Sequence, residues 1–360
     1  MPVRVAINGF GQIGRSVFRI GRVHPELDFV AVNDRVDSHT LAHLLKHDSI
    51  QGRFTDEVKS TGTSIIVGSR EIPVFSRNAP EKLPWKDLCV DVVLESTGIF
   101  TNRDDAYKHI VAGAQKVVIS APGSKPDVTI IPGVNENQYN MHQHHVVSMG
   151  SCTANCLAPI TKTLHDAFGI VYGYMTTVHS YTNNQVLLDS PHKDLRRART
   201  MAQSIFPTTT AAIEVIHKTI PELTGRLEGI SVRVPTPTVA LVDFVATLSK
   251  RTSKEEVNEC LKTAADGSLK NIMDCIDDPF VSADFQGSPY SSIVDLPCTQ
   301  VIGGSMVKII AWYDNCLLYT SDAADDLLCV DLGGGRIIKK KKIKHYTILE
   351  LFPTLKSHLS

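Results

Sequence analysis

A short apolar run followed at once by a glycine-rich turn constrains the fold of this chain more than any other feature. The run covers residues 3–7, the turn has the pattern G-x-G-x-x-G over residues 9–14, and apolar residues then recur at helical spacing. A second β-branched run ends in Asp34, about 20 positions after the last glycine. This order of strand, turn, helix, strand and acid is what a dinucleotide-binding unit requires. The sequence therefore predicts an α/β protein.

The glycine turn also predicts a cofactor. Glycines allow the tight turn and let a pyrophosphate approach backbone N–H groups where the helix begins. Asp34 is expected to accept hydrogen bonds from adenine-ribose hydroxyls and to repel a 2′-phosphate, which favours NAD over NADP, although Arg35 beside it weakens that preference. A glycine-rich turn in an unrelated α/β protein is the alternative. The cofactor-binding residues expected here are Gly9, Phe10, Gly11, Gln12, Ile13, Gly14 and Asp34.

Composition and patterning predict a two-domain enzyme of the cytoplasm. The chain has 360 residues with a formal net charge of −1, which gives no global attraction to nucleic acid or membrane. Its eight cysteines show no disulfide-framework spacing, and we expect neither a signal peptide nor a membrane span. Strand-like and helix-like runs alternate to about residue 148, which favours a doubly wound parallel sheet of the Rossmann type. Longer strand runs follow, so we expect an α+β domain with a mixed or antiparallel sheet.

The hexapeptide of residues 151–156, S-C-T-A-N-C, predicts a nucleophilic thiol. Ser151 is a good N-cap, so Cys152 is expected in the first turn of a helix that ends at Gly169. A helix N-terminus and a nearby imidazole both favour the thiolate, and His179 follows a strand-like run. A buried structural cysteine is the alternative. A metal pair with Cys156 is rejected because no second ligand pair follows, so no metal is expected.

Eight motifs in order resemble the phosphorylating glyceraldehyde-3-phosphate dehydrogenase family. The resemblance extends from residue 1 to residue 315. The motifs are residues 9–15, 95–98, 120–122, 151–156, 179–183, 194–199, 233–237 and 311–315. The resemblance implies a Rossmann-type NAD domain over residues 1–150 and a catalytic domain over residues 151–315. Erythrose-4-phosphate dehydrogenase shares this framework and stays the alternative activity.

The resemblance implies oxidation of glyceraldehyde 3-phosphate to 1,3-bisphosphoglycerate in glycolysis and gluconeogenesis. Cys152 attacks the aldehyde, His179 accepts the hydroxyl proton as hydride passes to NAD, and inorganic phosphate cleaves the resulting thioester. The backbone N–H of Cys152 and the imidazole are expected to stabilise the oxyanion. The family is homotetrameric, with the loop around residues 194–199 lining a neighbour's cofactor site. No nucleic-acid or membrane partner is expected.

Further site residues are implied by the same resemblance. Arg233, Thr182 and Arg197 match the family's anion-binding residues, and arginine suits them because its planar fork stays charged. Asn315 matches the residue that holds the nicotinamide carboxamide. The other phosphate-contacting positions are Ser151, Thr153, Thr210 and Ala211, and the other cofactor positions are Arg77, Thr97 and Ser120.

The sequence departs from the family in several places. Gln12 stands where the family usually has Arg, and Ala211 where it usually has Gly. The pair Ser190-Pro191 mixes the residues of NAD-specific and NADP-using members, so use of NADP stays open. Residues 316–360 do not match the family. We expect them to be non-native or disordered in place of the helix that closes the NAD domain, which lowers stability and weakens cofactor binding. A catalytically weak NAD-binding or thiol redox protein is therefore a second hypothesis.

Overall fold

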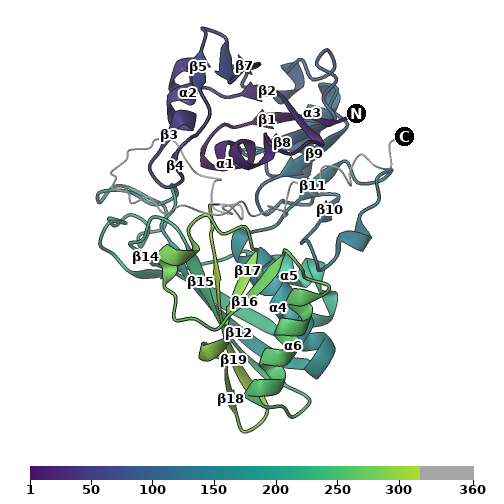
Figure 1. The fold of residues 1–360 in the computed structure, drawn as a ribbon, viewed down its shortest axis with the longest axis vertical. Coiled ribbons are helices and arrows are strands. Elements are labelled where there is room, and N and C mark those ends of the chain that lie inside the picture. The colour runs from purple at the N-terminus through teal and green to yellow at the C-terminus, as the bar shows by residue number, and fades with distance from the viewer. Residues whose placement is uncertain (317–360) are drawn as a thin grey trace. The chain divides into compact units, whose positions relative to one another are not determined.

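The computed structural model describes residues 1–316, which form two compact units (Figure 1). Unit 1 contains residues 1–128 and 140–149, and unit 2 contains residues 129–139 and 150–316. Residues 129–139, which the predicted boundary at residue 150 assigned to the first domain, cluster with unit 2. Residues 317–360 lie outside the described residues, and with them almost all of the tail that was expected to be non-native or disordered.

Unit 1 is built on a nine-stranded sheet in the order β10-β11-β9-β8-β1-β2-β7-β6-β5. Strands β11, β9, β8, β1, β2 and β7 pair in parallel, whereas β7, β6 and β5 are antiparallel neighbours. The strands are β1 Val3–Asn8, β2 Leu27–Asn33, β5 Val58–Ser60, β6 Ser64–Val67, β7 Arg70–Phe75, β8 Val92–Glu95, β9 Lys116–Ile119, β10 Val128–Thr129 and β11 Val146–Ser148. The predicted doubly wound parallel sheet is confirmed.

The strand order of unit 1 reverses at β1, since β2 lies on one side of it and β8 on the other. Ligands of doubly wound sheets bind beyond the carboxyl ends of the strands at such a switch point. The remaining elements of the unit are α1 Gln12–Gly21, α2 Ser38–Lys46, α3 Arg103–Val111, a short turn η1 Pro80–Lys82 and a two-stranded hairpin of β3 His47–Asp48 and β4 Gly52–Arg53. The glycine turn leading into α1 therefore sits at the position where a dinucleotide is expected.

A buried polar network lies beneath this switch point. Glu95, the last residue of β8, is fully buried, and its carboxylate accepts hydrogen bonds from Asn8 Nδ2 (2.5 Å), from Thr97 N (2.9 Å) and from the Thr97 hydroxyl. His109 on α3 lies 3.0 Å from the same carboxylate through Nε2, while its Nδ1 accepts from Trp85 Nε1 at 2.9 Å. Because Trp85 must donate, His109 carries its proton on Nε2 and donates it to Glu95. The network fixes the chain segment that follows β8.

Unit 2 is built on an eight-stranded mixed sheet in the order β13-β14-β12-β15-β19-β17-β16, with β18 paired to β19. Pairs β12/β14 and β16/β17 are parallel and the other pairs are antiparallel, as the mixed-sheet prediction expected. The strands are β12 Ile170–Ser180, β13 Phe206–Thr208, β14 Leu227–Val234, β15 Ala240–Leu248, β16 Met273–Ile276, β17 Ser292–Asp295, β18 Gln300–Ile302 and β19 Met306–Tyr313.

Helices α4 Cys152–Phe168, α5 Ala212–Thr219 and α6 Lys254–Asp266 contact this sheet and enclose the core of unit 2. Short 3₁₀ turns complete the unit: η2 Glu136–Gln138, η3 Pro221–Leu223, η4 Ser282–Phe285 and η5 Leu296–Cys298. Within residues 1–316, no helix is both long enough and apolar enough to cross a membrane.

Helix α4 has the bounds that the sequence predicted. Ser151 has an extended backbone, and its Oγ accepts the N–H of Ala154 at 3.0 Å, which satisfies one of the free donors at the helix start. Gly169 ends the helix with φ = 69°, a conformation that glycine adopts without strain. The helix is buried along most of its length, including Leu157, Ile160 and Leu164. Burial on this scale holds its N-terminus rigidly within unit 2.

Candidate active site

The predicted thiol and imidazole meet inside unit 2. Cys152 is the first residue of α4, His179 is the penultimate residue of β12, and Cys152 Sγ lies 3.4 Å from His179 Nε2. Both side chains are buried. The neighbouring cysteine differs, because Cys156 Sγ faces Ser292 Oγ at 3.8 Å and burial raises the pKa of the Cys156 thiol to about 12. Only the first of the two thiols therefore has a base within reach.

The imidazole of His179 is held from its far side. Its Nδ1 lies 2.7 Å from the carbonyl oxygen of Ser180 and 2.6 Å from a guanidinium nitrogen of Arg233. The Ser180 carbonyl accepts a proton carried on Nδ1, whereas the guanidinium nitrogen can only donate and opposes that proton. With Nδ1 protonated, the lone pair of Nε2 faces Cys152. Burial and then the charge of Arg233 hold the pKa of His179 well below its ordinary value, against the opposing effect of the Ser180 carbonyl. The ring is therefore a neutral base at physiological pH.

Arg233 supplies a buried positive charge beside this pair. It also donates to the Ser180 carbonyl at 3.0 Å, and its side chain is almost fully buried. Burial lowers the pKa of Arg233 to about 10, which leaves the guanidinium charged at neutral pH. The register of the sheet explains its position, because His179 and Arg233 are directly paired across β12 and β14. The pairing of two strands that are far apart in the sequence thus brings the base and the cation together.

Tyr313 is a site residue that the sequence analysis missed. Its hydroxyl lies 2.8 Å from Thr153 Oγ1 and 2.9 Å from Thr177 Oγ1, and its ring meets the His179 ring edge-on with centroids 6.0 Å apart. Burial raises the pKa of Tyr313 well above its ordinary value, so the hydroxyl stays protonated. Period-two alternation along β19 was the available signal, because it places Tyr313 on the same buried face as Ala311 and Ile309.

The structure places the predicted phosphate-binding residues at several points of unit 2. Arg197 donates through two nitrogens to Thr208 Oγ1 at 3.1 and 3.0 Å, and its charge contributes to lowering the Arg233 pKa. Thr182 donates its N–H to Gln185 Oε1 at 3.1 Å, while its own hydroxyl oxygen is buried without a partner among the described residues. A buried hydroxyl of this kind is suited to a ligand oxygen.

Thr210 and Ala211 lie where α5 begins. Thr210 Oγ1 accepts the N–H of Ala212 at 3.2 Å, and Ala211 is the N-cap residue with φ = −86°. Alanine adopts this conformation freely, so the backbone at Ala211 does not require the glycine that the family usually has. The N-terminus of α5 thus remains intact in spite of the departure.

Asn315 is buried at the end of β19. Its Oδ1 accepts a hydrogen bond from Ser180 Oγ at 2.9 Å, and its Nδ2 lies 3.9 Å from Cys316 Sγ. Because Ser180 directly follows His179, Asn315 belongs to the same cluster of residues as the thiol and the base.

The three turn glycines of unit 1 have different surroundings. Gly9 has φ = 93°, and a Cβ there would lie 2.7 Å from Thr97 N; a Cβ on Gly14 would lie 2.3 Å from the carbonyl oxygen of Gly9. Both positions therefore require glycine for packing. A Cβ on Gly11 would have nothing within 4 Å. Gly11 is the N-cap of α1 and receives no side-chain cap, so open space adjoins helix N–H groups, which suits a pyrophosphate.

Gly11→Ala is expected to separate cofactor binding from folding. The added methyl group meets no protein atom but occupies the space that a pyrophosphate needs. We expect an unchanged Tm without NAD and an NAD dissociation constant raised at least about tenfold, as for about 1.4 kcal/mol. Thermal unfolding and NAD titration measure the two quantities. Gly14→Ala is the matched control, because its Cβ would overlap the backbone and must lower the Tm of the protein without ligand.

The other predicted cofactor residues of unit 1 lie at the glycine turn or follow the carboxyl ends of β2, β7, β8 and β9. Asp34 Oδ2 accepts the N–H of Phe10 at 2.7 Å, so the acid lies against the glycine turn. The Asn33 side chain accepts a hydrogen bond from Arg77 N at 2.9 Å and donates one to the Arg77 carbonyl at 3.0 Å. Ser120 N donates to the carbonyl of Glu95 at 2.9 Å. Gln12 and Ile13 open α1, and Thr97 follows β8. These residues therefore lie at the edge of the sheet where a dinucleotide is expected.

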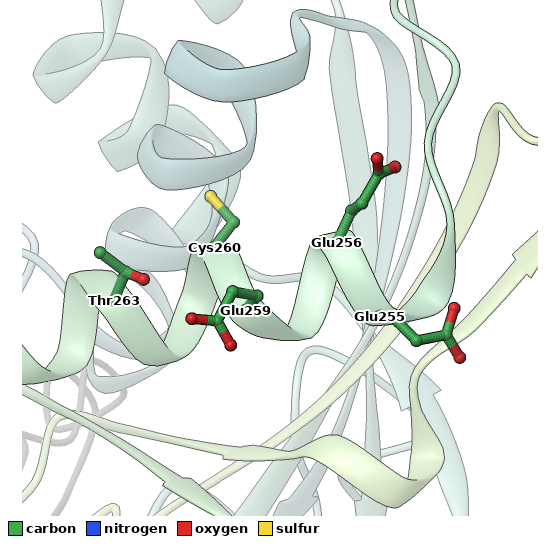
Figure 2. A pocket seen from close by; sticks show the side chains of 5 residues that line it. All are labelled: Glu255, Glu256, Glu259, Cys260 and Thr263. Carbon is green, nitrogen blue, oxygen red and sulfur yellow. The ribbon is translucent and has the colours of Figure 1, made fainter.

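A shallow depression along α6 does not form a second site. It is lined by Glu255, Glu256, Glu259, Cys260 and Thr263. Figure 2 shows the three carboxylates pointing in different directions rather than converging. Glu256 is already engaged, because it accepts the N–H of Ser253 in a capping box at the start of α6. Among the described residues, no three or more His, Cys, Asp or Glu side chains are placed so that they could hold a metal ion, here or elsewhere.

Both units contain sequence that matches one protein family. Residues 3–103 match the family described as glyceraldehyde 3-phosphate dehydrogenase, NAD binding domain, and residues 151–315 match its C-terminal domain. The chain is 54% identical to a glyceraldehyde-3-phosphate dehydrogenase of Geobacillus stearothermophilus over 325 residues, covering 90% of this chain and 97% of the relative. Glyceraldehyde-3-phosphate dehydrogenase 1 of Bacillus subtilis is 51% identical over the same shares of both chains.

Proposed function

This chain belongs to the glyceraldehyde-3-phosphate dehydrogenase family, and from this premise we propose that Cys152, His179 and Arg233 carry out its reaction. It is an NAD-dependent oxidoreductase of glycolysis. The product is 1,3-bisphosphoglycerate, formed from glyceraldehyde 3-phosphate and inorganic phosphate. The observation that carries the assignment of roles is the 3.4 Å contact between Cys152 Sγ and His179 Nε2.

The first half of the reaction forms a thioester on Cys152. His179 Nε2 takes the thiol proton as the Sγ attacks the aldehyde carbon, and the C=O π bond opens to an alkoxide whose charge the backbone N–H at the start of α4 stabilises. The imidazolium returns the proton to this oxygen, which gives the hemithioacetal hydroxyl. His179 Nε2 then removes the proton of the hemithioacetal hydroxyl. NAD supplies the hydride acceptor, so that the loss of hydride and proton oxidises the hemithioacetal to the thioester. The Ser180 carbonyl stabilises the imidazolium through Nδ1.

The second half transfers the acyl group to phosphate. A phosphate oxygen attacks the thioester carbon, the carbon–sulfur bond breaks, and the sulfur leaves as the thiolate of Cys152. Arg233 and Arg197, whose charges are close enough to influence each other, are the cations that hold phosphate groups, and the Thr182 hydroxyl adds a donor. Fixed positive charge lets two anionic reactants approach each other without mutual repulsion.

The direct test is to trap the acyl intermediate. Mixing the protein with glyceraldehyde 3-phosphate and NAD in the absence of phosphate gives one NADH per active site in a burst, together with a mass increase on the peptide that contains Cys152. Adding phosphate discharges the adduct. A burst without a modified Cys152, or modification of Cys156 instead, contradicts the assignment.

The pH dependence of kcat/KM follows from the environment of His179. Burial and Arg233 hold its pKa well below the ordinary 6.5, so the neutral base persists as the pH falls through 6.5. We therefore expect the acid limb of the kcat/KM profile to lie below pH 6.5. Arg233→Gln removes the charge that disfavours the imidazolium and shifts this limb upward. Initial rates between pH 5 and pH 8 measure it, and an acid limb at or above 6.5 in the unmodified protein contradicts the account.

The family's homotetramer is the proposed assembly of this chain. The sheet of unit 2 has one face covered by helices, and on the opposite face Tyr172 of β12 is 66% exposed and Tyr174 is 48% exposed, with Ile230 of β14 beside them. Apolar surface of this kind favours a second copy. Light scattering should give about four chain masses of 39.5 kDa. We also propose the cytoplasm as the location, since the seven cysteines of residues 1–316 are free thiols.

We further propose which substrate and which cofactor the protein prefers. We favour glyceraldehyde 3-phosphate over erythrose 4-phosphate, and the contact of Asp34 with the glycine turn supports NAD over NADP. The thiol redox protein is the second candidate, because it needs only Cys152 and its imidazole. Sustained NADH formation separates the dehydrogenase from this second candidate.

A further inference from the structure

Ser180 connects the catalytic base to Asn315. Its side chain is fully buried at the end of β12, and its Oγ donates to Asn315 Oδ1 at 2.9 Å. Its carbonyl oxygen lies 2.7 Å from His179 Nδ1 and accepts from Arg233 at 3.0 Å. The backbone carbonyl of Ser180 therefore contacts the base His179, while its side chain contacts Asn315.

The backbone around Asn315 is already fixed by its neighbour. The buried carboxylate of Asp314 accepts the Thr238 hydroxyl at 3.0 Å and Cys316 N at 2.9 Å through Oδ1, and Gly287 N at 2.7 Å through Oδ2. These bonds restrain the main chain on both sides of Asn315. What remains to be set is the orientation of the Asn315 side-chain amide.

A side-chain amide has two ends of nearly equal size and opposite chemistry, so its hydrogen-bond partners decide which end faces a ligand. The Ser180 hydroxyl donates to the oxygen of Asn315, and within residues 1–316 the nitrogen has only the weak acceptor Cys316 Sγ at 3.9 Å. The side-chain nitrogen of Asn315 therefore offers an N–H donor to a ligand, and this donor suits the carboxamide oxygen of nicotinamide.

We propose that Ser180 is a positioning residue whose hydroxyl fixes the Asn315 amide with its nitrogen toward the nicotinamide. The hydroxyl thereby sets which face of the nicotinamide ring receives the hydride. The proposal rests on the proposed role of Asn315 in holding the cofactor. It assigns Ser180 no contact with substrate or cofactor.

Ser180→Ala tests the proposal because it removes the hydroxyl and keeps the carbonyl that holds His179. We expect the KM for NAD to rise roughly fivefold to tenfold, as for one lost hydrogen bond. With glyceraldehyde 3-phosphate deuterated at the aldehyde carbon, deuterium should appear on both faces of C4 of the reduced cofactor, whereas the unmodified protein labels one face. Alkylation of Cys152 by iodoacetamide without cofactor should keep its rate. Ser180→Cys, with a weaker donor, should give a smaller rise in KM.

Two controls separate positioning from a structural effect. Ser231 is buried in the adjacent strand β14, and its Oγ has no partner within the described residues, so Ser231→Ala removes a similar atom and should change none of these quantities. In an Asn315→Ala background, Ser180→Ala should add nothing, because the hydroxyl acts through Asn315.

Single-face labelling with an unchanged KM in Ser180→Ala overturns the proposal, and so do additive effects of the two substitutions. Absence of NADH formation by the unmodified protein is a different result, since it contradicts the proposed function itself.

Discussion

Cys152→Ser is expected to reduce phosphate-dependent NADH formation by at least about a thousandfold, because a serine hydroxyl lacks the thiolate character and leaving ability that both halves of the reaction need. Sulfur attacks the aldehyde and then leaves from the thioester, and oxygen at the same position does neither well. The substitution is nearly isosteric at a buried helix start, so the Tm should stay close to that of the unmodified protein. Initial rates and thermal unfolding measure the two effects.

Cys156→Ser is the matched control. This thiol lies on the same helix and is equally buried, but it faces Ser292 rather than an imidazole, and burial raises its pKa to about 12. Turnover in this variant should stay within about twofold of the unmodified protein, as for a group outside the reaction. Equal losses in both variants would show that the thiols matter for folding rather than for chemistry.

His109→Leu is expected to cost about 3 kcal/mol of unfolding free energy, although His109 takes no part in the reaction. Leucine fills a similar volume but removes the Nε2 donor from the Glu95 carboxylate and the acceptor from Trp85. The carboxylate is completely shielded from solvent, so water does not replace the lost donor. A decrease in Tm of roughly 6–12 °C follows for a unit of this size, measured by calorimetry without cofactor.

Two further variants locate the origin of that cost. Trp85→Phe removes one bond between neutral groups and leaves Glu95 paired, so it should cost only about 1 kcal/mol. His109→Gln retains a donor and an acceptor on one side chain and should recover part of the loss. A His109→Leu protein as stable as the unmodified one would show that the network contributes nothing to unit 1.

Local sequence signals predicted the elements that carry the chemistry. Helix α4 has the predicted start and end because both are set by neighbouring residues, namely the hydroxyl of Ser151 and the positive φ of Gly169. Strands β15 and β19 are two of the longer strand runs expected in the second domain, because long β-branched runs are unambiguous. The glycine turn and Asp34 were predicted as parts of one site, and the structure shows that Asp34 accepts the N–H of Phe10, since the pattern is contained in one βαβ unit.

Contacts that depend on tertiary packing could not be predicted in this way. The pairing of His179 with Arg233 follows from the register of β12 on β14, which no local pattern specifies. His109 lies on a helix whose sequence is mostly polar, and only the structure shows that it faces a buried carboxylate. Residues 129–139 cluster with unit 2 although the chain on both sides belongs to unit 1, a crossing that composition does not reveal.

The measurement that tests the account most directly is NADH formation by the purified full-length chain given glyceraldehyde 3-phosphate and NAD, with inorganic phosphate present or omitted. Because phosphate must release the acyl group from Cys152, we predict sustained turnover with phosphate and a single burst without it. Folded protein that forms no NADH would contradict the assigned activity. Sustained turnover that ignores phosphate would contradict acyl transfer to phosphate and show that water discharges the thioester.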